Sequence, residues 1–515
     1  MNGAESLVRT LADAGVEVCF ANPGTSEMQF VAALDAFDGV RPILALFEGV
    51  ATGAADGYGR MAGKPAATLL HLGPGFGNGI ANLHNARRAR TPVVNIIGDH
   101  ASYHLELDAP LTSDIVSLAN PVSGWLRTCE SADALAADGA AAVAASMAFP
   151  GEIATLIVSA DFAWNESNGP AKPVAPAPAP EADPAAIDAV CAALKSGAPS
   201  TLILGGPALR ADCLHEAGRI AAATGARLIC ETFPARIERG AGRVAVERLP
   251  YFGEMAAEYL NPFERLIMVG AKPPVSFFAY PGKPGRLTPE DADCLTLTTP
   301  RQDALSALGA LADALAAPKE PALVQRAQSP EPPTGKLSAE GIGAIVGALL
   351  PENAIVSDEA ATAGLALYPL TAGAPPHDWM TLTGGAIGQG LPLALGAAVA
   401  CPDRKTVCLQ ADGSAMYTVQ ALWTMARENL DVTTVIVNNG SYAILNIELA
   451  RVGVAAPGEK AKSLLDLTNP VIDWVSIAEG MGVEAARATT VEQFNREFET
   501  AMASRGPRLI EAVIA

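Results

Sequence analysis

Residues 410–446 read QADGSAMYTVQALWTMARENLDVTTVIVNNGSYAILN, and this stretch decides the fold that we expect for the chain. It begins at the end of a short apolar run and turns at Asp412. Residues 417–427 carry apolar side chains at helical spacing, and residues 432–437 are β-branched and apolar, as in a buried parallel strand. A second turn follows at Asn439. The stretch therefore predicts a strand, a helix and a second strand that form one parallel βαβ unit.

The two turns of this unit predict a metal-bound diphosphate. Both follow the carboxyl ends of parallel strands, where open α/β sheets bind their ligands. The oxygens of Asp412 and Asn439 can therefore face one point, and they suit Mg²⁺ that also holds a diphosphate. The backbone N–H groups of residues 413–415 open a helix and offer an anion site. Taken singly, Asp412 could instead cap the helix and Asn439 could lie in a turn, but the pair favours the metal site.

The composition predicts a soluble, acidic and cytoplasmic protein of about three domains. Half of the 515 residues are hydrophobic, which is enough for each domain to bury a core. The formal net charge of −20 argues against nucleic acid or an anionic membrane as a partner. The eight cysteines include no CxxC pair, so neither zinc nor a disulfide framework is expected. The sequence starts without a signal-peptide pattern, and no apolar run is long enough to span a membrane.

Two proline-rich stretches, residues 167–184 and 318–335, are expected to be extended linkers. They divide the chain into residues 1–166, 185–317 and 336–515, called here the first, middle and third regions. Helical and short apolar segments alternate in each region, so we predict three α/β domains, each with a doubly wound parallel sheet. The middle region has no GxGxxG sequence, which argues against a dinucleotide fingerprint.

A second candidate site lies in the first region. Glu48 ends the apolar run LALFE and opens the Ala/Gly-rich helix GVATGAADGYGR, so its carboxylate is expected to be partly buried. By itself, Glu48 could simply be a carboxylate that the helix dipole favours. His71 ends another predicted strand, and the glycine-rich stretch at residues 72–79 follows it. A lone histidine is more often structural, but here the surrounding motifs favour a functional one.

The whole chain resembles the thiamine diphosphate-dependent 2-oxo acid decarboxylases and carboligases. It is most similar to short acetolactate synthase-like proteins and to benzoylformate decarboxylase. The similarity rests on these stretches, in family order: ANPGTSE at 21–27, LFEGVATGAADGYGR at 46–60, HLGPGFGNGIANLHNA at 71–86, GGAIGQGLPLALGAA at 384–398, ADGSAMYTVQALWT at 411–424 and NNGSYAIL at 438–445. One departure is Ala411, which replaces the first glycine of the family's GDG-type turn. The resemblance implies pyrimidine-binding, middle and diphosphate-binding domains in that order.

The resemblance also implies roles for individual residues. Glu48 would hydrogen-bond the ring nitrogen N1′ of the cofactor's aminopyrimidine, and His71 would bind the substrate carboxylate or transfer a proton. Ile387 would hold the cofactor bent, while the carbonyl of Gly385 would accept a hydrogen bond from its 4′-amino group. The expected Mg²⁺ ligands are Asp412, Asn439 and the carbonyl of Ser441. The residues expected near the diphosphate are Ala361, Thr362, Ser414, Ala415, Tyr417 and Tyr442. The residues expected to line the substrate pocket are Thr25, Ser26, Phe277, Phe278 and Ile444.

The reaction stays open within this family. Benzoylformate decarboxylase has a second histidine where this chain offers Phe277 and Phe278, and acetolactate synthases have a glutamine where this chain matches near Leu111. We expect an acetolactate synthase-like enzyme that makes or breaks a carbon–carbon bond next to the carbonyl of a 2-oxo acid or related ketone. The alternatives are a simple 2-oxo acid decarboxylase, a flavin-dependent oxidase and a non-catalytic partner subunit that binds the cofactor. The expected cofactors are thiamine diphosphate and Mg²⁺ without FAD, and the expected assembly is at least a homodimer and commonly a homotetramer.

Overall fold

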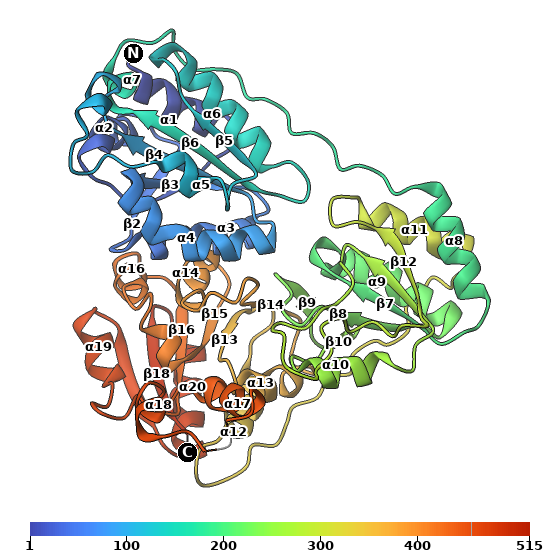
Figure 1. Ribbon diagram of the computed structural model, residues 1–515. Helices are drawn as coiled ribbons and strands as arrows, with labels where there is room; N and C mark the ends of the chain where they lie inside the picture. The colour runs from blue at the N-terminus through green and yellow to red at the C-terminus, as the bar shows by residue number, and fades with distance from the viewer. Residues whose placement is uncertain (455, 515) are drawn as a thin grey trace.

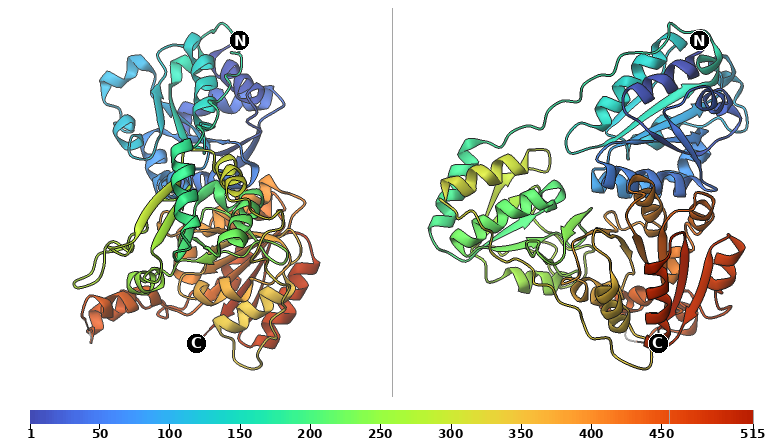
Figure 2. Two further views of the ribbon diagram at one scale, coloured as in Figure 1. Left: turned by 90° about the vertical axis from the view of Figure 1, so that its right-hand side faces the viewer. Right: turned by 180° about the vertical axis from the view of Figure 1, so that it is seen from behind.

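Three sheets organise the molecule, and each comes mainly from one region of the chain. The computed structural model describes residues 1–454 and 456–514. The first region lies above the third, and the middle region lies beside both (Figures 1 and 2). No helix of the described residues is long and apolar enough to cross a membrane.

The first sheet has six parallel strands in the order β2-β1-β3-β4-β6-β5. These strands are β1 Val18–Asn22, β2 Arg41–Leu44, β3 Ala66–His71, β4 Val93–Asp99, β5 Trp125–Thr128 and β6 Ile153–Ser159. The helices are α1 Gly3–Asp13, α2 Met28–Ala36, α3 Glu48–Ala62, α4 Leu72–Ala89, α5 Ile115–Ala119, α6 Ala132–Ser146 and α7 Ala160–Trp164, with short 3₁₀ turns η1 Thr25–Glu27 and η2 Ser102–Leu107. Every residue of β6 is buried, as expected for a parallel strand that helices cover on both faces.

The middle sheet has five parallel strands in the order β10-β8-β7-β11-β12. These strands are β7 Ser200–Leu204, β8 Arg227–Cys230, β10 Glu247–Arg248, β11 Arg265–Val269 and β12 Asp293–Thr298. Its helices are α8 Pro184–Lys195, η3 Gly206–Leu209, α9 Ala211–Thr224, α10 Gly253–Leu260 and α11 Ala304–Ala314. The described residues between α7 and α8 form no helix or strand and run as an extended trace from the first region to the middle one (Figure 2).

The third sheet has seven strands in the order β17-β18-β16-β15-β13-β14-β9. Its strands are β9 Ile237–Arg239, β13 Ile355–Glu359, β14 His377–Thr381, β15 Thr406–Ala411, β16 Val432–Asn438, β17 Glu484–Ala488 and β18 Arg508–Val513. Its helices are α12 Ala339–Leu349, α13 Gly364–Leu370, α14 Gly390–Ala400, α15 Asp412–Ala415, α16 Ala421–Arg427, α17 Ala443–Arg451, α18 Glu459–Ser463, α19 Trp474–Gly480 and α20 Val491–Ala503. The prediction of an α/β fold with three sheets dominated by parallel strands is confirmed.

Strand β9 departs from that prediction, because its residues belong to the middle region but it forms an edge strand of the third sheet. It pairs antiparallel with β14, and Ile237 lies opposite Trp379. An uncovered β14 would leave a row of backbone N–H and C=O groups without partners, and β9 supplies those partners. The middle region is therefore tied to the third through backbone hydrogen bonds as well as through side chains.

Two local predictions in the third region were wrong at their boundaries. The helix expected over residues 417–427 begins only at Ala421, because Tyr417 and Thr418 make tight backbone turns back to Ser414 and Ala415. The acidic turn is itself one turn of helix, α15. Strand β13 extends through Asp358 and Glu359.

Helix α3 of the first region packs directly on α14 of the third, and two glycines make this approach possible. A side chain at Gly57 would meet the carbonyl oxygen of Leu393 at 2.0 Å, and one at Gly396 would meet that of Ala54 at 1.8 Å. Both positions must therefore lack a Cβ for the helices to lie this close. The contact joins the helix that starts at Glu48 to the helix that follows residues 384–389.

Candidate active site

Glu48 is the first residue of α3 and is buried, with 9% of its surface exposed. Its Oε2 accepts a hydrogen bond from Asn78 Nδ2 of α4 at 3.0 Å. A side chain at Gly75 would come within 3.2 Å of Glu48 Oε1, so the glycine-rich start of α4 leaves room beside the carboxylate. Within the described residues Oε1 makes no hydrogen bond, so the carboxylate keeps one oxygen for a ligand.

His71 ends β3, as predicted, and lies in a small acidic cluster. Its Nδ1 lies 2.8 Å from Glu27 Oε2 and 3.2 Å from Ser26 Oγ. Glu27 is only 2% exposed and also accepts hydrogen bonds from Gly24 N and Ser26 Oγ. With Nδ1–H held by this carboxylate, Nε2 is the nitrogen left to bind or transfer a proton. Thr25 lies exposed in the same 3₁₀ turn, so two predicted substrate residues lie beside His71.

Glu27 was not among the predicted site residues, although the sequence contains a signal for it. It stands three residues after Gly24 in the turn ANPGTSE, the position of the glutamate in a capping box. The structure adds what the pattern could not show, namely that Oε2, the oxygen that accepts from Gly24 N, also reaches a histidine 44 positions away.

The two turns of the βαβ unit meet as predicted. Asp412 is 3% exposed; its Oδ1 accepts from Gly413 N and its Oδ2 from Gly440 N, each at 2.8 Å. Asn439 Oδ1 accepts from Ser441 N at 3.0 Å. Burial raises the pKa of Asp412, and within the described residues no cationic side chain pairs with it. A carboxylate, an amide oxygen and nearby backbone carbonyls are a donor set that suits Mg²⁺.

The described residues hold no group of three or more His, Cys, Asp and Glu side chains that could bind a metal. A metal at Asp412 would therefore depend on neutral oxygen ligands and on a diphosphate for the rest of its coordination. This is the manner in which Mg²⁺ binds with phosphate-bearing cofactors.

The residues predicted near the diphosphate lie around this turn. Ser414 and Ala415 are buried in α15, and Ser414 Oγ accepts a hydrogen bond from Gln410 Nε2 at 2.6 Å. The Tyr442 ring covers Gly413, where an added Cβ would lie 2.4 Å from it, and the Tyr417 side chain packs on Gly388. Ala361 and Thr362 follow strand β13. Ala361 has a left-handed backbone with φ of 49°, an uncommon and strained conformation for a residue with a side chain.

The loop at residues 383–389 precedes α14. We call it the cofactor loop, because it contains two residues of the predicted cofactor site. Gly385 has a φ of 76°, and a side chain there would lie 2.5 Å from the ring of Phe277. Ile387 is half-buried in the same loop. Phe277 and Phe278 are 44% and 55% exposed, with ring centroids 4.9 Å apart. Phe277 therefore brings the middle region to the cofactor loop.

The predicted residues thus form two groups. Thr25, Ser26, Glu48 and His71 belong to the first region, whereas the cofactor loop and the Asp412 turn belong to the third. Ile444 is half-buried near the start of α17, close in sequence to the Asn439 turn. Within the described residues, no side-chain hydrogen bond or ion pair joins Glu48 or His71 to the third region.

Glu359 is a second residue that the sequence did not indicate. It ends β13, is 4% exposed, and accepts hydrogen bonds from Gly388 N at 2.7 Å and Gly390 N at 2.5 Å. Burial raises the pKa of Glu359 to about 7, despite the backbone N–H groups that favour its charged form. Glu359 therefore supports the cofactor loop from the side of the sheet.

We expect the Glu359→Gln variant to show a flatter dependence of unfolding free energy on pH. The folded-state pKa lies above the ordinary value of 4.5, so the folded protein holds an extra proton between these values. Stability must then fall as the pH rises from about 4.5 through 7, by about 3 kcal/mol for this group. Urea unfolding of both proteins at pH 5.5 and pH 8 would test this. The same change in unfolding free energy between these pH values in the wild type and the variant would contradict it.

Comparison with known proteins places this geometry in a family. Residues 1–118 match the family described as "Thiamine pyrophosphate enzyme, N-terminal TPP binding domain", and residues 362–512 match the corresponding C-terminal TPP binding domain. The chain is 57% identical to the acetolactate synthase large subunit-like protein IlvX of Mycobacterium tuberculosis, over 100% of this chain and 99% of that protein. It is 29% identical to benzoylformate decarboxylase of Pseudomonas aeruginosa, over 96% of each chain.

A solved structure is similar over the whole molecule. The thiamine diphosphate-dependent 4-hydroxybenzoylformate decarboxylase of Rhodococcus jostii superposes with a TM-score of 0.87 at 26% identity, over 100% of this chain and 99% of that one. The matched stretches include Glu48, His71, Asp412 and Asn439. The chain belongs to the thiamine pyrophosphate enzymes.

Proposed function

We propose that this enzyme makes or breaks a carbon–carbon bond next to the carbonyl of a 2-oxo acid or a related ketone. The observation that carries the proposal is the Glu48 carboxylate, which is buried at the start of α3 and has one oxygen without a hydrogen-bond partner among residues 1–454 and 456–514. Bound thiamine diphosphate supplies a nucleophilic carbon and an electron sink for such reactions. In this proposal Glu48 holds the proton that it shares with ring nitrogen N1′ of the aminopyrimidine.

The third region would hold the other end of the cofactor. We propose that Asp412, Asn439 and the carbonyl of Ser441 ligate Mg²⁺. The carbonyl of Gly385 would accept from the aminopyrimidine, and Ile387 would support the bent cofactor. The residues proposed to surround the diphosphate are Ala361, Thr362, Ser414, Ala415, Tyr417 and Tyr442.

A simple decarboxylase is the second candidate, and the cluster around His71 favours it. Decarboxylation ends with proton transfer to carbon, and the imidazole of His71 is the proposed group for this transfer. Glu27 holds Nδ1, which leaves Nε2 for the substrate carboxylate or for that proton. Thr25, Ser26, Phe277, Phe278 and Ile444 would form a pocket of mixed polarity that accepts a modest hydrophobic acyl group.

A product panel tests these alternatives directly. Purified protein is incubated with thiamine diphosphate, Mg²⁺ and a series of aliphatic and aryl 2-oxo acids, and products are identified by chromatography. Acyloins would support the carboligase and aldehydes alone the decarboxylase. If the protein binds the cofactor but consumes no 2-oxo acid or acyloin, this result would favour the non-catalytic partner subunit and overturn the proposal.

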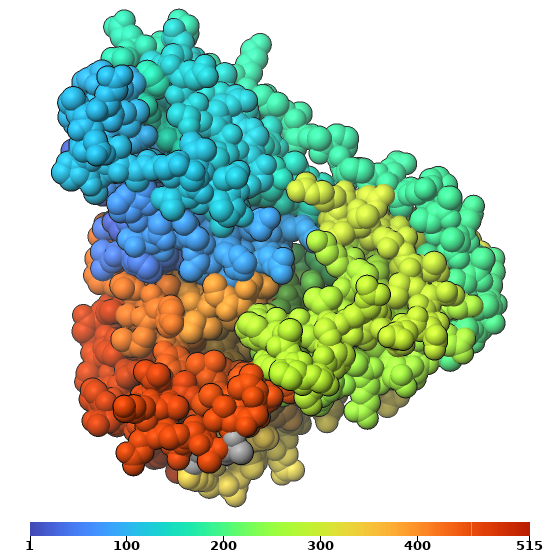
Figure 3. Space-filling model, in the orientation of Figure 1, coloured from blue at the N-terminus to red at the C-terminus, as the bar shows by residue number. Residues whose placement is uncertain are grey.

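We further propose that the enzyme works without flavin. A cavity of about 1050 Å³ lies where the three regions meet, and Figure 3 shows the surface hollowed there. Its lining includes Gly206 after β7, but the sequence there lacks the GxGxxG fingerprint. Flavin absorbance in the purified protein would contradict this proposal.

The proposed assembly is a cytoplasmic homodimer or a tetramer built from two dimers. Two observations support it. The side chains of Glu48 and His71 make no hydrogen bond to the part of the third region that the structure describes, and several apolar side chains near the site are exposed. Those side chains include Leu46 at 47%, Tyr417 at 53% and Leu445 at 44%. A second copy of the chain would cover them and complete the site.

A further inference from the structure

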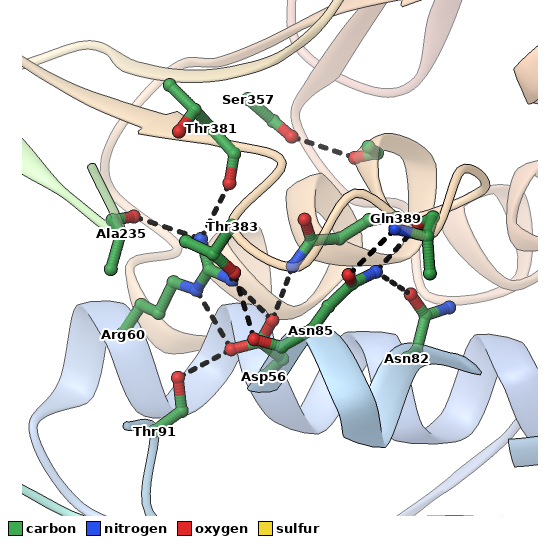
Figure 4. Close-up of polar contacts among 12 residues, drawn as sticks. Asp56, Arg60, Asn82, Asn85, Thr91, Ala235, Ser357, Thr381, Thr383 and Gln389 are labelled. Carbon is green, nitrogen blue, oxygen red and sulfur yellow. Dashed lines mark hydrogen bonds and ion pairs between the residues drawn. The ribbon is translucent and has the colours of Figure 1, made fainter. Parts of the chain in front are cut away.

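Three side chains of α4 bind three alternate carbonyls of the cofactor loop, and we call Asn82, His84 and Asn85 the α4 clamp. The contacts join His84 Nε2 to Gly384 O at 3.0 Å, Asn85 Nδ2 to Ala386 O at 2.7 Å and Asn82 Nδ2 to Gly388 O at 3.3 Å. Figure 4 shows Asn82 and Asn85 on their helix beneath the loop. The first region thus grips a loop of the third region of the same chain.

Asn85 is the centre of this clamp. Besides its bond to Ala386 O, its Oδ1 accepts from Ala386 N at 3.2 Å, so one amide satisfies both backbone groups of that residue. Its own backbone carbonyl accepts from Thr383 Oγ1 at 2.9 Å. Asn85 is fully buried. Loss of its amide would leave the part-buried N–H and C=O groups of Ala386 without their partners.

The ends of the loop are held from other directions. Glu359 binds the N–H of Gly388, and Thr418 Oγ1 donates to the Gly388 carbonyl at 2.9 Å. Gln389 Nε2 donates to Asp56 at 2.6 Å, and Asp56 also forms a buried ion pair with Arg60 of α3 at 2.7 Å (Figure 4). The clamp therefore acts on a loop whose far end is already fixed.

Two residues of the loop differ from their neighbours in their backbone hydrogen bonds. Gly384, Ala386 and Gly388 all give backbone groups to the protein, as described above. Within residues 1–454 and 456–514, the backbone N–H and C=O groups of Gly385 and Ile387 make no hydrogen bond. Every second residue of the loop is thus hydrogen-bonded to the protein. The two residues between them, Gly385 and Ile387, are the ones proposed to contact the aminopyrimidine.

We propose that Asn85, supported by Asn82 and His84, is a positioning residue that fixes the loop so that Gly385 and Ile387 present their free groups to the aminopyrimidine of thiamine diphosphate. This role rests on the proposed function of Gly385 and Ile387. It assigns to the first region a second task besides carrying Glu48, because the same helix pair also sets the shape of the loop.

The test compares Asn85→Ala with Asn95→Ala, a matched control. Asn95 is an equally buried asparagine of the first region, and it bonds Thr68 and Thr155 far from the loop. Hydrogen–deuterium exchange of peptide 383–390 is measured on cofactor-free protein, and thiamine diphosphate affinity is measured by calorimetry with Mg²⁺. Should Asn85→Ala not fold, His84→Ala removes a single, half-buried partner of the same loop.

For Asn85→Ala we expect faster exchange in peptide 383–390 and an affinity for thiamine diphosphate lower by about 10-fold or more, since the two part-buried backbone groups of Ala386 lose their partners. The KM of the 2-oxo acid at saturating cofactor should stay within about twofold, because the substitution leaves the residues proposed to bind the substrate in place. Asn95→Ala should lower the melting temperature while both loop readouts stay at the wild-type level.

Unchanged exchange and affinity in Asn85→Ala, or equal losses in both variants, would overturn the positioning role. The exchange measurement needs neither cofactor nor substrate, so it decides on the clamp even if the proposed reaction is wrong. Conversely, a wild-type protein that binds thiamine diphosphate and turns over no substrate would overturn the proposed function alone.

Discussion

Glu48→Gln is expected to lower kcat by about 10²–10⁴-fold, the range for loss of a group that holds and moves a proton in the reaction. Glutamine has the same shape and can still accept from Asn78, but it cannot share a proton with ring nitrogen N1′. The fold and the affinity for thiamine diphosphate should therefore change little. Steady-state kinetics at saturating cofactor, together with circular dichroism, would measure both effects.

Glu17→Gln is the matched control for this substitution. Glu17 is an exposed glutamate of the first region that pairs with Lys64 on the surface, and such pairs contribute little to stability. We expect wild-type activity from this control. A Glu48→Gln enzyme with an unchanged rate would remove Glu48 from the mechanism.

Asp412→Asn is expected to weaken the joint binding of Mg²⁺ and thiamine diphosphate by about 100-fold, which corresponds to about 2.7 kcal/mol. The carboxylate uses one oxygen for Gly413 N and the other for Gly440 N, and the amide keeps an acceptor for one of these two backbone N–H groups. What it loses is the negative charge that binds the metal. Calorimetric titration across a range of Mg²⁺ concentrations would measure the loss and show partial recovery at high Mg²⁺.

The control for this second variant is Asp403→Asn, an exposed aspartate of the third region outside the site. It should bind the cofactor like the wild type. Wild-type cofactor binding by Asp412→Asn, with no shift in its Mg²⁺ dependence, would show that the two turns do not form the metal site.

Much of the fold could be predicted because buried parallel strands leave a plain pattern. Residues 432–437, for example, are all valine, isoleucine or threonine and therefore all β-branched, and they form β16 within one residue at each end. Strand β9 could not be predicted in the same way. Its three residues, Ile237–Arg239, are mostly charged. Their strand character comes from pairing with β14, in which Ile237 lies opposite Trp379, 142 positions away, and no local pattern encodes this pairing.

The candidate site was predictable where its residues end strands or begin helices. Glu48, His71, Asp412 and Asn439 all stand at such boundaries, and the matched family supports the cofactor. Glu27 and Glu359 were missed because the sequence around each of them resembles the sequence around other acidic residues of turns and loops. Their importance arises only from tertiary contacts, with His71 and with Gly388 respectively. The roles assigned to individual residues stay predictions until they are tested.

The close approach of α3 and α14 fixes the distance between two elements that carry proposed site residues. Glu48 begins one helix, and the cofactor loop leads directly into the other, so the gap between the two helix axes sets how far apart these two elements lie in one chain. That gap is as small as it is because Gly57 and Gly396 have no side chains. Within one chain, the distance between the start of α3 and the cofactor loop is thus set by two missing methyl groups, at positions outside the proposed site.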